Sequence, residues 1–263
     1  MRLGVQNPVR VSSDGSIPTA RHGYPLLNDD SVIFVTLTQL WRIRLAGARM
    51  SMHLGTMQLT VDHVQAALSL APSEFRSDFD LNPEVKAQQL AIHGKKPAAV
   101  LCGLREAEGR LHVVLTQRAA HLKQHAGQVA FPGGKIDAGD VSPEAAALRE
   151  ADEEIGLKPN AVKVLGALDP YLTSTGYTVT PYVGLIDPLW TPRPDPGEVD
   201  EIFEPPLDFL MDPANRRRHH HDRNGYRRYY YAMPWNGFYI WGATAGMLKG
   251  LSDRIETVAG RVR

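Results

Sequence analysis

The hydrophobic pattern from residue 59 onward predicts a domain that mixes strands with helices. Apolar runs bounded by polar or turn-forming residues are typical of strands, and four are present: 98–104, 110–118, 162–168 and 177–186. Residues 61–70, VDHVQAALSL, have the spacing of a short amphipathic helix that Thr60 could cap. A last amphipathic helix is expected to begin near Ile240. This mixture predicts a layered α/β or α+β domain with a mixed sheet.

Turn-forming residues define three further segments. Residues 75–84, FRSDFDLNPE, are predicted to be a loop, and residues 128–134, QVAFPGG, a short strand that ends in a Pro-Gly-Gly turn. Residues 216–233, RRRHHHDRNGYRRYYYAM, indicate two strands joined by an Asn-Gly hairpin turn.

The first 55 residues differ from the rest because they show no helical periodicity over a useful length. We expect residues 1–55 to be an N-terminal extension and residues 56–263 to form the domain. Two alternatives stay open for the extension. It is either a disordered segment or sequence upstream of a translation start at Met50, Met52 or Met57.

Composition restricts the classes of partner. The chain has 29 basic and 29 acidic side chains, so no overall attraction to nucleic acid or to an anionic membrane is expected. A single cysteine, Cys102, excludes an internal disulfide framework and fits a reducing compartment, so a cytoplasmic location is expected. The longest strongly apolar run, residues 32–40, is about half as long as a membrane-spanning helix. We therefore expect no membrane span.

A helix of about a dozen residues is predicted after Ser142. Ser142 can serve as the N-cap, Pro143 suits the first turn, and Gly156 can end the helix. On such a helix Glu150, Glu153 and Glu154 share one face.

Like charges at this spacing repel one another, so a group outside the helix has to neutralise the acidic face formed by Glu150, Glu153 and Glu154. Hard divalent cations such as Mg²⁺ prefer oxygen ligands and are held by a few carboxylates together with substrate phosphates. The alternative is a solvated acidic helix face, which is common in proteins.

At GGKIDAGDVSPEAAALREADEEIGL, residues 133–157, the sequence resembles the Nudix box, whose pattern is G-x5-E-x7-R-E-U-x-E-E-x-G-U with U aliphatic. The match is complete from Arg149 to Leu157. Upstream it departs, because Asp140 stands in place of the family's Glu and eight residues instead of seven separate it from Arg149. The preceding LTQRAAHLKQHAGQVAFPGG, with VTPYVG, EVDEIFEPPLDFL and IWGATA, resembles the coenzyme A pyrophosphatase branch of Nudix hydrolases.

The resemblance implies a Nudix α/β/α sandwich with a mixed sheet and a metal-dependent pyrophosphohydrolase. The substrate would be coenzyme A or a derivative, cut into adenosine 3′,5′-bisphosphate and 4′-phosphopantetheine or its acylated form, with Mg²⁺ or Mn²⁺ as cofactor. Other substrates stay open: NADH, a nucleoside diphosphate sugar or a damaged nucleotide. So does a non-catalytic nucleotide-binding module. The oligomeric state is also open, a homodimer included.

The resemblance also implies roles for particular residues. Glu150, Glu153 and Glu154 would bind metal and carry catalysis, and Arg149 would orient one of them through an ion pair. Glu198 could complete the metal site from across a cleft or be a solvated loop carboxylate. Asp140 is either a further ligand or a residue that satisfies a turn or an N-terminal amide.

Basic residues ahead of the helix are candidates for substrate binding: Arg118, His121, Lys123 and His125. They are suited to the 3′-phosphate of coenzyme A, and the alternative is a solvated basic loop. Gly133 and Gly134 would allow a tight bend and a close approach. His219, His220 and His221 are expected on the hairpin surface, because adjacent residues of a strand face opposite sides. Sheet and core packing is expected of the aromatic residues that follow, although one of them could contact adenine: Tyr229, Tyr230, Tyr231, Trp235 and Trp241.

Overall fold

The computed structural model describes residues 58–72, 76–84, 96–223 and 226–261. The expected extension over residues 1–55 therefore lies outside the described residues, as does the turn at Asn224 and Gly225. No helix in these described ranges is both long and apolar enough to cross a bilayer.

Two long strands form the centre of a seven-stranded sheet. β2 (Lys96–Ala107) runs parallel to β9 (Tyr177–Ile186). Five shorter strands complete the sheet: β1 (Arg76–Ser77), β3 (Arg110–Val113), β6 (Gly133–Lys135), β7 (Val162–Ala167) and β8 (Tyr171–Leu172). β3 and β6 pair antiparallel with β2, β7 and β8 pair antiparallel with β9, and β1 pairs parallel with β8. The predicted mixed sheet is confirmed.

Two three-stranded antiparallel sheets lie beside it. One is formed by β10 (Val199–Phe203), β4 (Leu115–Arg118) and β5 (Val129–Ala130). The other contains the predicted hairpin, β11 (Arg217–Arg223) and β12 (Tyr226–Trp235), together with β13 (Phe238–Trp241).

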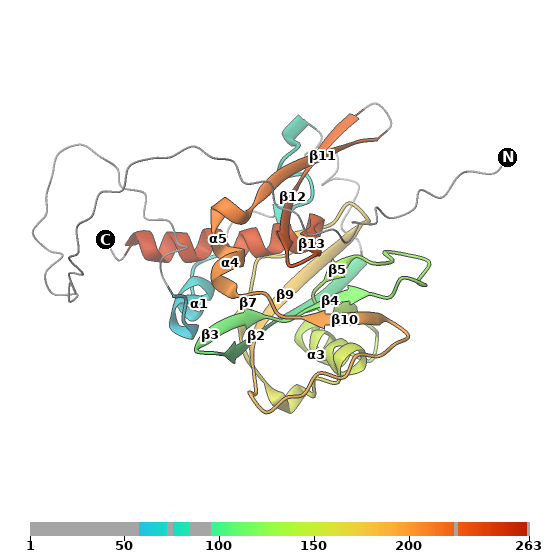
Figure 1. The fold of residues 1–263 in the computed structure, drawn as a ribbon, viewed down its shortest axis with the longest axis vertical. Helices are drawn as coiled ribbons and strands as arrows, with labels where there is room; N and C mark the ends of the chain where they lie inside the picture. Colours follow the sequence, from blue (N-terminus) through green and yellow to red (C-terminus); the bar gives the residue numbers. More distant parts are fainter. Residues whose placement is uncertain (1–57, 73–75, 85–95, 224–225, 262–263) are drawn as a thin grey trace, which may run out of the picture. The chain divides into compact units, whose positions relative to one another are not determined.

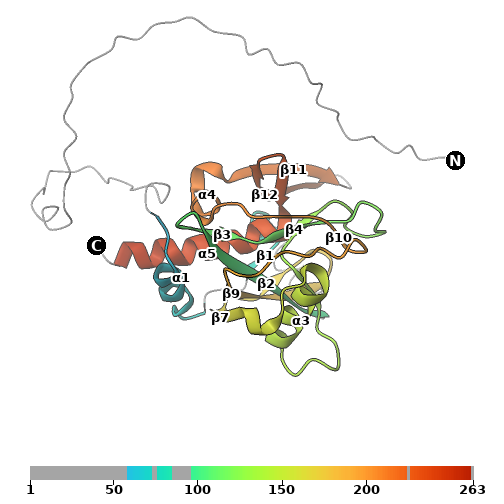
Figure 2. The same ribbon diagram turned by 60° about the horizontal axis from the view of Figure 1, so that its bottom comes forward.

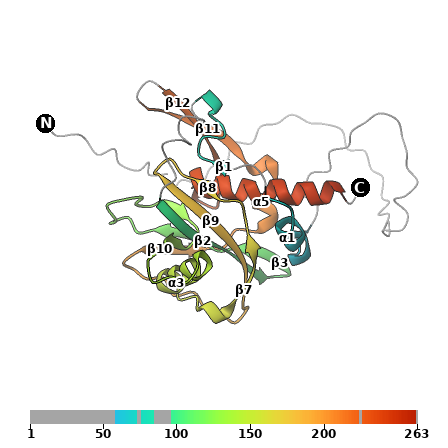
Figure 3. The ribbon, with the colours of Figure 1, turned by 180° about the vertical axis from the view of Figure 1, so that it is seen from behind.

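Helices cover both faces of the large sheet. α3 (Pro143–Ile155) packs on one face, and α1 (Val61–Leu68), α4 (Leu207–Met211) and α5 (Gly242–Arg261) pack on the other. Figures 1, 2 and 3 show β2 and β9 between α3 and α5. The arrangement is the expected α/β/α sandwich.

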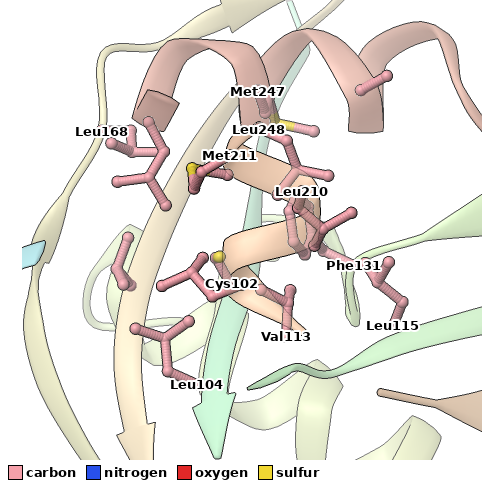
Figure 4. Packing of buried hydrophobic residues seen from close by; sticks show 14 of the residues in the cluster. Cys102, Leu104, Val113, Leu115, Phe131, Leu168, Leu210, Met211, Met247 and Leu248 are labelled. Carbon is pink, nitrogen blue, oxygen red and sulfur yellow. The ribbon is translucent and has the colours of Figure 1, made fainter. Parts of the chain in front are cut away.

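The side chains of β2 alternate between two apolar clusters, as a strand covered on both faces requires. Cys102 and Leu104 pack under α4 and α5, where Figure 4 shows them with Met211 and Leu248. Leu101 points to the opposite face, into the cluster that holds α3. Burial raises the pKa of the Cys102 thiol to about 12, so the cysteine stays protonated at neutral pH and is inert.

The residues that predicted the two ends of α3 have the expected roles. The Ser142 hydroxyl accepts a hydrogen bond from the backbone N–H of Ala145 at 3.1 Å, and Pro143 occupies the first turn. Gly156 ends the helix with a φ of 66°, a left-handed conformation that favours glycine. The helix therefore begins and ends at the predicted residues.

Three local predictions were incomplete or wrong. The run 110–118 divides at Val114 into β3 and β4, which belong to different sheets, and residues 76–77 of the expected loop form β1. Gly133 and Gly134 do not form a turn. They lie in β6 and pair with Val100 and Ala99 of β2. In each case the chain finds its backbone partners in strands distant in sequence, which local patterns do not reveal.

Candidate active site: an acidic helix face beside a cavity

The three glutamates of α3 share one helical stripe but differ in exposure. Glu154 is buried, with only 3% of its surface exposed, whereas the Glu153 side chain is 58% exposed. Glu150 lies between these extremes, with a side-chain exposure of 17%. Glu153 therefore faces solvent and the adjacent Glu154 faces the protein interior, with Glu150 one turn earlier in an intermediate position.

Burial changes the charge state of Glu154 in the metal-free protein. Desolvation raises the pKa of Glu154 to about 8, and the negative charges of Glu198 and Glu150 add to the rise. Two groups favour the ionised form. Arg118 Nη1 lies 3.6 Å from Glu154 Oε1, and the backbone N–H of Gly133 donates to Oε2 at 3.3 Å. At neutral pH this pKa favours the protonated form of the Glu154 carboxyl.

Glu150 lies directly against the backbone of β6. A Cβ placed on Gly134 would lie 2.5 Å from Oε1 of Glu150, which is closer than such atoms approach. Only glycine leaves room for the carboxylate here. Desolvation raises the pKa of Glu150 as well, against the lowering effect of Arg149. The close approach expected of Gly134 is thus present, although it occurs in a strand.

Arg149, in the middle of α3, connects Glu150 and Glu153 of the helix with Asp140, which precedes it. Its guanidinium lies 3.1 Å from Oε1 of Glu150, and its Nη1 donates to Oε2 of Glu153 at 3.0 Å. It also binds Asp140 through two parallel hydrogen bonds, from Nε to Oδ1 at 2.9 Å and from Nη2 to Oδ2 at 3.1 Å. A planar guanidinium suits such bidentate pairing.

The carboxylate of Asp140 accepts hydrogen bonds from other residues of the chain. Besides the two bonds from Arg149, its Oδ2 accepts the backbone N–H of Asp137 at 2.8 Å. These hydrogen bonds from Arg149 and Asp137 hold the pKa of Asp140 below its usual range. Of the two roles left open for Asp140, its contacts favour the one that satisfies a turn. The bidentate pair with Arg149 was not foreseen, because eight intervening residues give no helical register between the two.

Glu198 approaches the stripe from the loop before β10. Its backbone carbonyl accepts the N–H of Ala119 at 2.8 Å, which holds it beside the end of β4. Its charge raises the pKa of both Glu150 and Glu154, so the three carboxyl groups repel one another. Glu198 is exposed and can turn toward the stripe.

A cavity of about 650 Å³ adjoins this acidic face, a volume suited to a nucleotide-sized ligand. Arg118 and Gly133, which both contact Glu154, line the cavity. The remaining wall comes from residues 76–81, from β8 and the loop after it, from β12 and from the start of α5. Glu154 does not line the cavity itself, but it contacts two residues that do, Arg118 and Gly133.

The predicted substrate-binding residues do not all reach this cavity. Arg118, His125 and Gly133 line it. His121 and Lys123 have exposed side chains in the loop between β4 and β5 and are not among the lining residues. The basic stretch is thus divided between the cavity wall and solvent, because the loop turns outward after Ala119.

The expectation of sheet and core packing applies to only part of the aromatic set. Trp235 packs as expected, stacked near Phe203 and Phe238. Tyr231 also packs against the core, and Tyr230 packs edge-on against Trp241. These residues line the cavity as well, together with Tyr229. Of the histidines, His221 also lines the cavity. Sequence reasoning missed this wall because strand alternation does not show which face of the hairpin meets a hollow.

Comparison with known proteins agrees with this geometry. The sequence model of the NUDIX domain matches residues 94–228. The uncharacterized Nudix hydrolase NudL of Escherichia coli K12 is 42% identical over 192 residues, which are 71% of this chain and 96% of the relative. The chain belongs to the Nudix family. It is a Nudix hydrolase, that is, a pyrophosphohydrolase.

Solved structures with Nudix names are more distant. RenU of M. smegmatis is 21% identical, with 65% of this chain and 89% of that chain covered and a TM-score of 0.39. The NUDIX domain of Shewanella oneidensis NrtR in complex with ADP ribose is 23% identical, with 50% and 88% covered and a TM-score of 0.36. The family assignment rests on the domain match and on the bacterial relative.

Nudix hydrolases use divalent cations, and the donor set of this one fits such an ion. Glu150, Glu154 and Glu198 repel one another across the site, and a cation would remove that repulsion. Within the described part of the chain, no group of three or more acidic, His or Cys side chains is close enough to hold a metal by itself. A divalent cation in this site would therefore need ligands from water or substrate in addition to the carboxylates.

Proposed function

We propose that this Nudix hydrolase cuts the pyrophosphate bond of coenzyme A or one of its derivatives. The products are adenosine 3′,5′-bisphosphate and 4′-phosphopantetheine or its acylated form. The observation that carries the proposal is the contact of Arg118 and Gly133 with Glu154, since both residues also line the cavity. A nucleotide in that cavity has its phosphates beside the acidic stripe.

The glutamates and Arg149 have different roles in this proposal. Glu150 and Glu154 hold the cation, with Glu153 and Glu198 at the exposed side of the same site. Arg149 fixes Glu150 and Glu153 so that the carboxylates stay in place when the cation is lost. When bound, Mg²⁺ or Mn²⁺ polarises the phosphoryl oxygens and stabilises charge on the leaving phosphate.

Arg118, in the cavity wall, has a different role. In the metal-free protein its guanidinium partly neutralises Glu154. With a cation on the carboxylates, Arg118 would be available to bind two oxygens of the pyrophosphate through its guanidinium. His125 lies in the same wall, and its Nδ1 is 2.8 Å from Oε1 of Gln128, which also lines the cavity. Gly133 lets β6 lie directly against β2, and Gly134 leaves room for the carboxylate of Glu150. We place His121 and Lys123 at the exposed entrance of the phosphate site.

We propose coenzyme A over other pyrophosphates because segments that resemble the coenzyme A pyrophosphatase branch line the cavity beside Arg118. The stretch LTQRAAHLKQHAGQVAFPGG supplies the lining residues Arg118, His125 and Gly133. IWGATA supplies a further part of the wall, from Trp241 to Thr244. We further propose that residues 56–263 are sufficient for this activity, with residues 1–55 as an extension, and that the enzyme acts in the cytoplasm.

Product analysis tests the proposal. The full-length chain is incubated with Mg²⁺ or Mn²⁺ and a panel of pyrophosphates: coenzyme A, 3′-dephospho-coenzyme A, NADH, a nucleoside diphosphate sugar and an oxidised nucleoside triphosphate. Mass spectrometry should find adenosine 3′,5′-bisphosphate, with coenzyme A cleaved most efficiently. EDTA should abolish the activity, and added Mg²⁺ or Mn²⁺ should restore it.

The alternatives predict different outcomes of the same experiment. Faster cleavage of another panel member would replace coenzyme A as the substrate and leave the Nudix chemistry standing. Binding of Mg²⁺-nucleotide without any hydrolysis would favour a non-catalytic binding module. The complete glutamate stripe argues against that module, because binding alone does not require three carboxylates that repel one another.

A further inference from the structure

A second part of the cavity wall carries cations that have no contact with the glutamates. Arg76 of β1 and Lys249 of α5 both line the cavity, and Asp253 lies behind them, one turn further along α5. We call these three residues the β1–α5 corner. Residue 76 and α5 both lie outside the range 94–228 that matches the NUDIX domain. The corner therefore belongs to the part of the chain that surrounds the common domain.

One carboxylate serves both cations of the corner. Asp253 Oδ2 lies 2.7 Å from Nη2 of Arg76 and 2.6 Å from Nζ of Lys249. Lys249 Nζ also donates to Oδ1 at 2.8 Å. A single negative charge cannot balance two positive charges, so the corner retains an excess of one. Each of the three side chains keeps between 22% and 29% of its surface exposed, so a ligand in the cavity can reach them.

Further charged groups lie near the corner and outside its ion pairs. Arg216, half-buried beside the corner, adds a cation whose pKa is lowered by burial, and Glu256 faces it. Asp80 also lines the cavity, where its Oδ1 accepts the Ser77 hydroxyl at 2.8 Å, and it has further contacts of its own.

Another ion pair near the corner joins Arg254 of α5 to Asp169, which lies between β7 and β8. The two side chains are 2.8 Å apart and nearly buried, at 8% and 7% exposure. The Arg254 guanidinium also donates to backbone carbonyls, including that of Leu70 at 3.0 Å. That pair is balanced and closed to solvent. The corner is neither, which favours a binding role over a purely structural one.

The cavity wall beside the corner is held in a fixed position. The side chain of Asn82 pairs with both backbone groups of Tyr229, accepting from its N–H at 2.9 Å and donating to its carbonyl at 3.1 Å. Arg228 donates to Asp78 at 3.1 Å. These contacts join residues 76–84, blue-green in Figure 1, to strand β12. The aromatic residues of β12 and the cations of the corner therefore form one wall.

We propose that Arg76 and Lys249 bind a phosphomonoester on the nucleotide, separate from the pyrophosphate that is cut. This inference rests on the proposed function, under which the group is the 3′-phosphate of coenzyme A. A phosphomonoester carries nearly two negative charges at neutral pH, and arginine and lysine both bind such a group well. It competes with Asp253 for the donors of both cations. The tyrosines of β12 line the same cavity and suit the adenosine that carries the phosphate.

Binding of product-like nucleotides in EDTA tests the inference without metal or catalysis. Calorimetry on the full-length protein compares adenosine 3′,5′-bisphosphate with adenosine 5′-monophosphate. The bisphosphate should bind roughly ten- to a hundredfold more tightly, the range expected for hydrogen bonds to a charged group. Lys249→Met and Arg76→Gln should each remove most of that difference and leave binding of the monophosphate within about twofold of wild type.

Asp253→Asn provides a test of opposite sign. Loss of the competing negative charge should tighten bisphosphate binding, whereas a merely structural ion pair predicts weaker binding or none. Lys163→Met is the matched control, because Lys163 is an exposed lysine of β7 that does not line the cavity. Equal affinity of the wild-type protein for the two nucleotides would overturn the inference, and so would weaker bisphosphate binding by a folded Asp253→Asn protein.

Hydrolysis separates this inference from the proposed function. If coenzyme A is cleaved but Lys249→Met leaves the kcat/KM ratio of coenzyme A to 3′-dephospho-coenzyme A unchanged, the corner is not the phosphate site. If coenzyme A is not cleaved, yet the bisphosphate is preferred and Lys249→Met removes the preference, the proposed substrate is wrong and the phosphate site stands.

Discussion

The backbone N–H of Gly133 donates to Oε2 of Glu154 at 3.3 Å, so the strand that lines the cavity directly contacts the buried end of the acidic stripe. Gly133 has a φ of 150°, and a Cβ there would lie 2.5 Å from the carbonyl oxygen of Ala99. Glycine at this position is thus required for β6 to lie against β2. The pairing of β6 with β2 in turn places a hydrogen-bond donor at the carboxyl group.

Glu154→Gln should lower kcat by about 100-fold or more, within the range that a positioned acid or base contributes. Glutamine keeps the shape of the side chain and can still accept from Gly133, but it cannot carry the charge that holds a cation. Steady-state kinetics with Mg²⁺ measure the loss of turnover, and calorimetry with Mn²⁺ measures the loss of cation binding. Glu153→Gln should reduce turnover in the same direction.

Asp152→Asn is the control for these substitutions, because Asp152 lies on the same helix and pairs with Lys158 at 2.9 Å, away from the stripe. It should keep kcat within about twofold of wild type, since exposed pairs of this kind contribute little. A folded Glu154→Gln protein with near-normal turnover would contradict the assignment of Glu154.

The stability of the metal-free protein should fall as pH rises through neutrality. The pKa of Glu154 is raised from 4.5 to about 8 in the folded protein, chiefly by burial, so the folded state binds the proton more tightly than the unfolded state. Between these values the unfolded state carries fewer protons, and the free energy of unfolding decreases with a slope of up to about 1.4 kcal/mol per pH unit. Above the folded pKa the decrease from this group ends.

Urea denaturation in EDTA between pH 5.5 and 8.5 measures this dependence. Glu154→Gln has no group that titrates at this position, so its curve should be flatter than that of wild type over the same interval. Parallel curves for the two proteins would show that Glu154 is not the group responsible.

Gly134→Ala should impair catalysis more than folding. The new Cβ would lie 2.5 Å from the carboxylate of Glu150, which is the movable end of a side chain, so Glu150 shifts and the backbone stays in place. A displacement of about 1 Å at a catalytic group can reduce the rate roughly 100-fold. We expect kcat to fall at least tenfold with little change in Tm.

Gly139→Ala controls for the effect of replacing a glycine by alanine in this part of the chain. A Cβ on Gly139 meets nothing within 4 Å, so this variant should keep both activity and Tm. Equal activity of the two alanine variants would show that Glu150 tolerates the displacement.

Deletion of residues 1–50 should leave hydrolysis intact. The acidic stripe, Arg149, the cavity wall and both core clusters are built from residues 59 and beyond. The values of kcat/KM and Tm of the truncated chain should equal those of the full-length protein. A truncated chain that fails to fold would show that the extension is an integral part of the domain.

Much of the fold could be predicted because its signals are local. The N-cap at Ser142, the glycine at 156 and the spacing of Glu150, Glu153 and Glu154 all operate within one helix. The strand at 177–186 has the predicted bounds because it is rich in β-branched and aromatic residues and ends before Asp187 and Pro188. The helix features depend on hydrogen bonds and side-chain contacts between residues a few positions apart, which the order of residues determines directly.

Pairing between distant segments could not be predicted in the same way. The sequence by itself determined the family, the acidic stripe and most strands and helices of the sandwich. Only the tertiary structure decided that Arg118 lies beside Glu154, that Asp140 binds Arg149, and that Arg76 shares Asp253 with Lys249. The physical reason is that burial and charge compensation depend on which segments pack together. A carboxylate therefore acquires its pKa and its partners only when the sheet, the helices and the hairpin have assembled.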